Sequence, residues 1–283
     1  MNYIKYLQNL FFNLCCLKFM DEIFSKNGFS VIRNLISSNE SKKLRLEINK
    51  VFQLPKNEVS QSQLKSKTYT CPDGVTKFDA FWKIIFNNKL LNAVKRILGD
   101  EIRYTQHSDL HINLGAGNYH RDNAYREFNN GPDWNLNEAE YKIVRVAIYL
   151  SDYSNSGSSL IVLPGTHKKE SRTHAIELKF WRYVRNYLRK KNIASKLPHL
   201  FFSNKKVLIK TKPGDCIIFD QRLIHAGGII KGINPKYSIF LSYGAPNIHS
   251  YNHHNFYLAR PTYLKRIPPQ LRRKLKEKKL LLE

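Results

Sequence analysis

The chain has 283 residues and a mass of 33.2 kDa, which is long enough to bury a sizeable core. Its hydrophobic content of 42% and aromatic content of 12% exclude a disordered chain. Lysine and arginine number 47 against 22 acidic residues, giving a net charge of +25. This indicates either a compositional bias or an anionic partner, namely nucleic acid, a membrane surface or an acidic substrate.

The first hundred residues are predicted to form a helical support. Residues 1–20 are apolar but interrupted by polar residues, which predicts an amphipathic helix that packs on the body or lies on a membrane surface. A turn at Asn27-Gly28 should precede a short strand, and Ser37 should begin a helix whose apolar stripe reaches Phe52. No segment has the roughly 18 uninterrupted apolar residues of a membrane span.

The next part of the support is predicted as a loop and a long helix. Residues 54–75 are rich in Pro, Ser and Gln and contain Asp73-Gly74, which is typical of a loop. The apolar stripe from Phe78 to Leu98 predicts one helix, with Gly99 as its C-terminal glycine.

From Ile102 to about residue 250, short alternating runs separated by turn residues predict an antiparallel β core. In the run from Asp109 to Leu114 the polar residues share one face, which meets solvent unless it lines a site. Further strands are expected at Ile143 to Leu150, Leu160 to Leu163, Val207 to Lys210, Cys216 to Phe219 and Tyr237 to Tyr243.

Two basic segments complete the chain. Residues 168–205 are predicted to be a helical insertion, and residues 251–283 a basic tail in which a short helix follows Pro268-Pro269. With no internal repeat, we expect one catalytic domain over residues 1–283. The four cysteines do not make a disulfide framework and indicate a reducing, cytoplasmic setting, with peripheral membrane contact left open.

His120 and Asp122 lie two residues apart, so in an extended strand both side chains share one face. One further histidine would complete a 2-His-1-carboxylate facial triad, which leaves three metal positions open and is typical of non-haem Fe(II) oxygenases. The stretch from Phe219 to His225 is the candidate partner. On its own the His-x-Asp pattern is also compatible with a hydrogen bond in a surface loop.

The order of the motifs resembles the phytanoyl-CoA dioxygenase (PhyH) family of Fe(II)/2-oxoglutarate oxygenases. Four blocks carry the resemblance: Phe24 to Phe52, His120-Arg121-Asp122, Val146 to Leu150 leading to Leu163-Pro164-Gly165-Thr166-His167, and Pro213 to Asp220 running into His225-Ala226-Gly227. They span about residues 24–245. The resemblance implies a mostly β fold, with a double-stranded β-helix (jelly-roll, cupin-like) core, a helical N-terminal part and flanking helices.

The resemblance also implies roles for individual residues. It makes His120, Asp122 and His225 the iron ligands and 2-oxoglutarate the co-substrate. The family's carboxylate-binding arginine, eleven residues after the second histidine, is replaced here by Lys236, which offers a point charge without the bidentate fork. Ser238 is expected to add a hydroxyl to the same carboxylate, and Asn113 to line the co-substrate site.

The implied reaction is hydroxylation of a small or lipid-linked organic substrate, with release of succinate and CO2. Arg121, Arg126 and Arg145 flank the expected pocket and favour an anionic substrate, although solvated side chains fit equally well. Asp122 argues against the halogenating relatives, which carry a small residue there. Two alternatives stay open: a metal-dependent oxygenase or lyase that does not use 2-oxoglutarate, and a non-enzymatic binder of anionic membrane or, less favoured, nucleic acid.

Overall fold

The computed structural model describes residues 22–65, 67–115, 118–134, 137, 139–190 and 205–283. The amphipathic helix expected over residues 1–20 lies outside the described residues, and so does the last part of the expected insertion. None of the helices in the described ranges is long and apolar enough to cross a bilayer.

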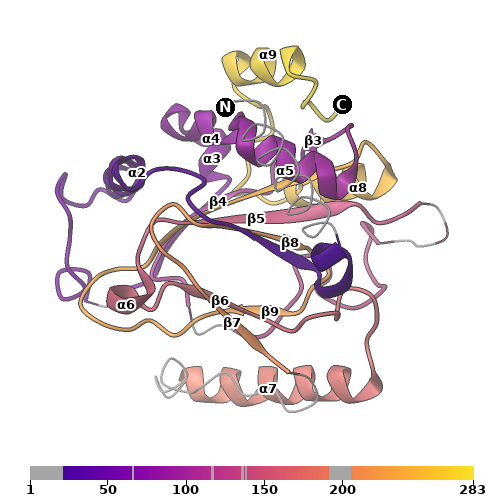
Figure 1. Ribbon diagram of the computed structural model, residues 1–283, viewed down its shortest axis with the longest axis horizontal. Coiled ribbons are helices and arrows are strands. Elements are labelled where there is room, and N and C mark those ends of the chain that lie inside the picture. Colours follow the sequence, from indigo (N-terminus) through magenta and orange to yellow (C-terminus); the bar gives the residue numbers. More distant parts are fainter. Residues whose placement is uncertain (1–21, 66, 116–117, 135–136, 138, 191–204) are drawn as a thin grey trace, which may run out of the picture.

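Two antiparallel sheets face each other and form a jelly roll, as expected (Figure 1). The larger has the order β1-β8-β5-β10-β4-β2, with β3 also pairing with β10, and the smaller has the order β7-β6-β9. The strands are β1 Phe29–Ile32, β2 Tyr69–Pro72, β3 Arg103–Tyr104, β4 Asp109–Ile112, β5 Ile143–Tyr149, β6 Ser159–Val162, β7 Val207–Lys210, β8 Cys216–Asp220, β9 His225–Gly227 and β10 Tyr237–Gly244.

Helices cover the outer face of the large sheet, and one long helix lies beneath the small sheet (Figure 1). The helices are α2 Ser38–Val51, α3 Gly74–Lys77, the 3-10 helix η1 Asp79–Phe81, α4 Trp82–Ile85, α5 Asn88–Leu98, α6 Tyr153–Ser156, α7 Arg172–Lys190, α8 Ile248–Leu258 and α9 Pro269–Glu277. Helix α7 is the one below the small sheet. Helix α2 begins as predicted, because the Ser37 hydroxyl accepts a hydrogen bond from the backbone N–H of Glu40.

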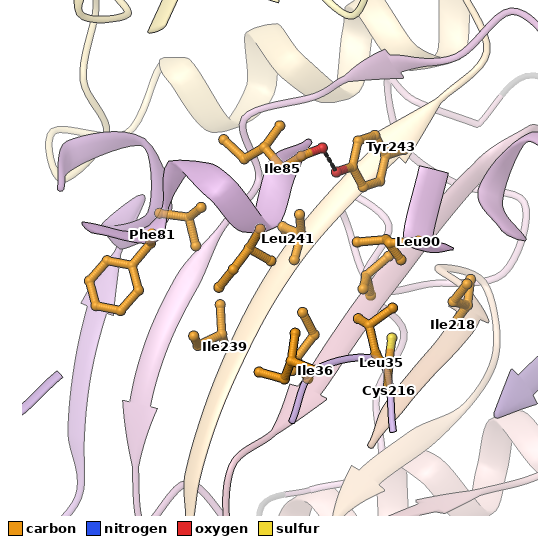
Figure 2. Packing of buried hydrophobic residues seen from close by; sticks show 14 of the residues in the cluster. Leu35, Ile36, Phe81, Ile85, Leu90, Cys216, Ile218, Ile239, Leu241 and Tyr243 are labelled. Atoms are coloured by element: carbon orange, nitrogen blue, oxygen red, sulfur yellow. Dashed lines mark hydrogen bonds between the residues drawn. The ribbon is translucent and has the colours of Figure 1, made fainter. Parts of the chain in front are cut away.

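Alternation in the central strands separates an apolar face from a polar one. In β10, Ile239, Leu241 and Tyr243 pack against the helices, as Figure 2 shows. The intervening Ser238 and Phe240 line a cavity on the other side of the sheet. Strands β4 and β5 follow the same rule, so the interior between the sheets receives polar side chains.

The predicted helix from Phe78 to Leu98 is wrong in its continuity. It is divided into η1, α4 and α5, because the chain leaves helical geometry at Asn87 (φ −65°, ψ 115°). The Asn87 side chain accepts a hydrogen bond from the N–H of Leu90 at 3.0 Å and so begins a new helix. The expected loop at 54–75 also contains β2.

The C-terminal residues belong to the same packed core. Leu271 and Leu275 of α9 are fully buried, and Leu281 forms a β-bridge with Tyr104. Helix α8, which the sequence did not predict, places Tyr257 in the wall of the cavity. Residues 251–283 are therefore a basic cover over the sheet.

Candidate functional site

His120 and His225 lie opposite each other in an isolated antiparallel β-bridge. The backbone N–H of His120 donates to the carbonyl of His225 and the reverse bond closes the pair, both at 3.0 Å. Directly opposite residues in an antiparallel pair place their side chains on one face, and the two imidazole centroids are 4.4 Å apart. The N–H of Asp122 donates to the carbonyl of Gln221, and the Asp122 carboxylate lies on the same side as the two imidazoles.

The three side chains converge on a common centre. One donor atom from each of His120, Asp122 and His225 lies within 4.8 Å of the others. Nε2 of His120 is 3.4 Å from Oδ1 of Asp122, and Nε2 of His225 is 3.7 Å from Oδ2. Two imidazole nitrogens and a carboxylate at this spacing form a donor set that could hold a divalent transition metal.

Backbone carbonyls fix the orientation of both imidazoles. Nδ1 of His120 is 2.8 Å from the carbonyl oxygen of Asn118, and Nδ1 of His225 is 3.0 Å from that of Leu223. A carbonyl can only accept, so each Nδ1 carries the hydrogen and each Nε2 turns its lone pair toward the common centre. The donor set therefore fits a metal ion.

The electrostatics favour the metal-binding protonation states. Burial alone would raise the pKa of Asp122, but the neighbouring side chains of His225, His120 and Arg145 outweigh it and hold that pKa well below its ordinary value. Burial lowers the pKa of His225 to about 4, so its imidazole is neutral near pH 7. A carboxylate and a neutral imidazole are the forms that bind metals.

The site opens into a cavity of about 700 Å³ between the two sheets. A cavity of this size accommodates a co-substrate together with a small organic molecule. Each layer of the fold contributes to its wall: Asp109, His111, Arg145, Ser238 and Phe240 from the large sheet, Leu160 and His225 from the small sheet, Arg182 and Asn186 from α7, and Tyr257, Arg260 and Tyr263 from the C-terminal part.

Lys236 is a buried cation in this cavity. Its side chain is almost fully buried, and Nζ donates to the carbonyl of Ser159 at 3.2 Å and lies 5.7 Å from the Tyr149 ring centre. Burial lowers the pKa of Lys236 to about 7, and the described residues supply no carboxylate as an ion-pair partner. Ser238, two residues along the strand, lines the same cavity. Together they offer a charge and a hydroxyl to an anionic ligand.

The structure corrects the expectation for Asn113. This residue has a left-handed backbone (φ 59°), which ends the alternation of β4 and turns its side chain away from the cavity. Its amide nitrogen donates to Gln61 Oε1 and to the carbonyl of Lys67, and its Oδ1 accepts from the backbone N–H of Lys236. Asn113 therefore anchors the backbone beside the buried lysine and does not line the cavity.

The expectation for Arg121 is also corrected. Arg121 lies between two residues that share a face, so strand alternation directs it to the opposite side. There it is buried, with NH2 donating to Glu170 Oε1 at 2.9 Å and to the carbonyl of Thr166 at 3.2 Å. It holds the segment of His120 and Asp122 to the loop before α7 and does not line the cavity.

The other two predicted arginines line the cavity in different ways. Arg145 is buried and ion-paired with Asp109, and its Nε lies 3.6 Å from Oδ2 of Asp122, so it is committed to carboxylates of the protein. Arg126 is exposed at the rim. Arg182 and Arg260 also line the cavity, although no sequence pattern pointed to Arg260, because α8 was not predicted.

A model of the phytanoyl-CoA dioxygenase (PhyH) family matches residues 24–233. The chain belongs to the PhyH family. Enzymes of this family use Fe(II) and 2-oxoglutarate, in agreement with the donor set and the buried cation beside it. No curated protein sequence matches the chain.

Solved structures similar to this PhyH chain include two enzymes from nogalamycin biosynthesis and one protein with hygromycin B bound. The epimerase SnoN in complex with Fe3+, alpha ketoglutarate and nogalamycin RO is 11% identical (TM-score 0.56), with 82% of this chain and 84% of that chain covered. The carbocyclase SnoK from nogalamycin biosynthesis is 14% identical (TM-score 0.56; 81% and 84% covered). HygX from Streptomyces hygroscopicus with nickel, 2-oxoglutarate and hygromycin B bound is 18% identical (TM-score 0.53; 80% and 86% covered). At these identities they show the shared jelly-roll fold.

Proposed function

We propose that this PhyH-family protein is an Fe(II)/2-oxoglutarate-dependent dioxygenase that hydroxylates a small, polar, anionic organic substrate and releases succinate and CO2. The observation that carries the proposal is the convergence of His120, Asp122 and His225 on one centre at the wall of a large cavity. In this proposal they are the iron ligands. Bound iron supplies the activation of dioxygen, coupled to decarboxylation of 2-oxoglutarate.

Lys236 and Ser238 are proposed to bind the distal carboxylate of 2-oxoglutarate. A buried lysine without an acidic partner is costly, and an incoming carboxylate removes that cost by pairing with the ammonium group. The Ser159 carbonyl already orients Nζ, which reduces the side-chain entropy lost on binding. The enclosing sheets exclude water from the ligand carboxylate and so strengthen the pair.

The rim of the cavity supports an anionic substrate. Arg126, Arg182 and Arg260 line it, and none of them forms an ion pair with an acidic residue in the part of the chain that the structure describes. Arg260 is held in place by stacking, with its guanidinium carbon 4.2 Å from the ring centre of Tyr257. Three arginines at one opening attract and orient a negatively charged group.

The decisive test measures succinate formation from 2-oxoglutarate in protein reconstituted with Fe(II). We expect turnover that requires both iron and 2-oxoglutarate and is lost in His120→Ala. Mass spectrometry of converted substrate then separates reaction types: hydroxylation adds one oxygen atom, epimerisation leaves the mass unchanged, and ring closure removes two hydrogen atoms. Iron-loaded protein that does not bind 2-oxoglutarate would refute the proposal.

The replacement of arginine by Lys236 motivates the alternative, a metal-dependent oxygenase or lyase that does not use 2-oxoglutarate. The variant Lys236→Ala distinguishes an enzyme that uses 2-oxoglutarate from one that does not. If Lys236 binds the distal carboxylate, the affinity of the metal-loaded protein for 2-oxoglutarate falls about 10- to 100-fold, in line with the loss of a buried charge-assisted hydrogen bond. Unchanged affinity would favour the alternative.

Helix α7 supports peripheral contact with an anionic membrane, which we propose as the location of the enzyme within a reducing, cytoplasmic compartment. Ile176, Phe180, Tyr183 and Tyr187 recur at helical spacing and are between 52% and 73% exposed. Arg172 and Lys179 of the same helix flank this stripe, a combination typical of helices that lie on a bilayer surface.

Sedimentation with vesicles tests the membrane contact. We expect binding to vesicles that contain phosphatidylglycerol and none to pure phosphatidylcholine vesicles, with the difference abolished by the double substitution Phe180→Ser and Tyr183→Ser. If this variant and the unaltered protein bind the vesicles equally well, α7 does not form the membrane contact.

A further inference from the structure

A chain of three buried hydrogen-bonding side chains, outside the metal site, ends at the cavity wall. Oδ2 of Asp133 is 2.7 Å from Nδ1 of His253, and Nε2 of His253 is 3.0 Å from Nδ1 of His107. Asp133 and His253 are fully buried, and His107 is 5% exposed. These three side chains connect the loop after the metal-binding segment, helix α8 and a residue two positions before β4.

The direction of these hydrogen bonds follows from Asp133, the carboxylate at the end of the network that lies away from the cavity. Both carboxylate oxygens of Asp133 accept from the backbone N–H of Ala124 at 3.0 and 2.9 Å, so this side chain is an acceptor. His253 must then carry a hydrogen on Nδ1 and, when neutral, present a lone pair at Nε2. His107 must in turn donate through Nδ1, which leaves its Nε2 as an acceptor.

The surroundings keep His107 uncharged. Burial and then the charge of Arg145 lower the pKa of His107 well below its ordinary value. The imidazole stacks on Tyr257 with centroids 3.6 Å apart and planes at 20°, which fixes the ring plane. The carbonyl of His107 also accepts a hydrogen bond from Arg145.

His107 and Asp109 both line the cavity, and Nε2 of His107 lies 3.9 Å from Oδ2 of Asp109. That spacing is too long for a hydrogen bond but allows one ligand group to reach both acceptors. Asp109 is already paired with Arg145, so its charge is balanced. This wall therefore offers hydrogen-bond acceptors without a net charge, whereas the rim offers the cations of Arg126, Arg182 and Arg260.

We propose that His107 is a substrate-binding residue that accepts a hydrogen bond from a hydroxyl group of the substrate, and that Asp133 and His253 are positioning residues that hold it in the acceptor tautomer. The inference rests on the proposed function, since it assigns the cavity beside the metal site to the substrate. It narrows the substrate class to hydroxylated anions such as phosphorylated or carboxylated polyols. An acyl chain would leave these polar groups without partners.

The tautomer is measured first, without substrate. In protein labelled with 15N-histidine, we expect the long-range 1H–15N spectrum to show His107 with a protonated Nδ1 and an unprotonated Nε2, with or without Zn(II) and 2-oxoglutarate. In Asp133→Asn, the carbonyl oxygen of the new side-chain amide can accept from Ala124 while its NH2 group donates to Nδ1 of His253. Both histidines then change tautomer, and the His107 N–H points at Asp109. An Nε2-protonated His107 in the unaltered protein would overturn the proposal.

Binding is measured next, with a matched pair of probes on the protein loaded with Zn(II) and 2-oxoglutarate. Glycerol 3-phosphate and propyl phosphate share an anion and a three-carbon chain, but only the first carries hydroxyl groups. We expect the unaltered protein to prefer glycerol 3-phosphate about five- to tenfold, and His107→Phe and Asp133→Asn to lose that preference while propyl phosphate binds as before.

The two proposals fail separately. Loss of 2-oxoglutarate binding in the unaltered protein counts against the proposed function, whereas the tautomer of His107 is read without any ligand. If the unaltered protein shows no preference between the probes, or if His107→Phe keeps the preference, His107 is not a substrate-binding residue. If Asp133→Asn keeps both tautomer and preference, Asp133 and His253 only support the fold.

Discussion

Arg145 lies against the carboxylate of Asp122 inside the protein, with Nε of the arginine 3.6 Å from Oδ2. Only 3% of Arg145 is exposed, and the same guanidinium is ion-paired with Asp109. Residues behind a metal ligand orient it, and their removal typically weakens metal binding 10- to 100-fold. A positive charge so close to the site also repels a metal ion, so orientation and repulsion act in opposite directions.

We expect orientation to dominate, because the buried guanidinium of Arg145 contacts both Asp109 and Asp122 and so fixes the position of the Asp122 carboxylate. Arg145→Met should therefore weaken Co(II) binding about tenfold or more, measured by calorimetry. Arg45→Met is the control, since Arg45 is also mostly buried and ion-paired, with Glu58, but lies outside the cavity. Tighter binding in Arg145→Met would mean that repulsion dominates.

The strands could be predicted from the sequence where polar and apolar residues alternate or where apolar residues follow one another without interruption. Strands β4, β5, β8 and β10 alternate or are continuously apolar, and they appear close to the predicted positions. Helix α8 was missed because its buried face is polar: His249, Ser250 and His253 are fully buried, so no apolar stripe marks the helix. The break at Asn87 was missed because the apolar stripe continues across it, and capping by a single side chain decided the boundary.

The candidate site was predictable as far as it depends on spacing along one strand. The His-x-Asp pair could be read from spacing, whereas Lys236 was implied by the resemblance to the PhyH family, and all three residues line one cavity. Asn113 was misassigned because a left-handed backbone at one residue is not visible in an alternating pattern. Asp133, His253 and His107 come from three distant segments, so no local pattern connects them.

The hydroxyl of Tyr243 gives a stability prediction. It donates to the carbonyl of Ile85 at 2.7 Å, at the point where α4 ends over the large sheet (Figure 2). Tyr243→Phe keeps the buried ring but leaves that carbonyl without the bond, so the free energy of unfolding should fall by about 1 kcal/mol in urea titrations. Tyr183→Phe, at a side chain that is 73% exposed, should change it by less than about 0.5 kcal/mol.

The turn between β7 and β8 gives a second stability prediction. Gly214 has a left-handed backbone (φ +92°), and an added Cβ would overlap the carbonyl oxygen of Ile36. Gly214→Ala should therefore cost more than the ~1–2 kcal/mol of the backbone conformation alone, since the two segments must separate. Gly165→Ala is the matched control: its φ is +80°, but the nearest atom is 3.8 Å away. Equal losses of unfolding free energy in the two variants would contradict this account.

The buried Lys236 predicts how 2-oxoglutarate affinity depends on pH. Burial lowers the pKa of its ammonium group to about 7 in the free protein, and a bound carboxylate raises it again. Below pH 7 the lysine is charged with or without ligand, so affinity is constant. Above pH 7 binding must take up a proton, so affinity should fall by up to tenfold per pH unit until the pKa of the complex is reached.

The same shift acts on stability in the opposite direction. Between about pH 7 and the ordinary lysine pKa of 10.5, the unfolded chain binds the proton and the folded protein does not, so the contribution of Lys236 to unfolding free energy rises with pH.

The pH dependence of 2-oxoglutarate affinity is measured by calorimetric titrations of 2-oxoglutarate into Zn(II)-loaded protein from pH 6 to 9. Lys236→Arg should remove the pH dependence because arginine stays charged, and Lys231→Ala, outside the cavity, should preserve it. A flat profile in the unaltered protein would show that Lys236 does not pair with the co-substrate.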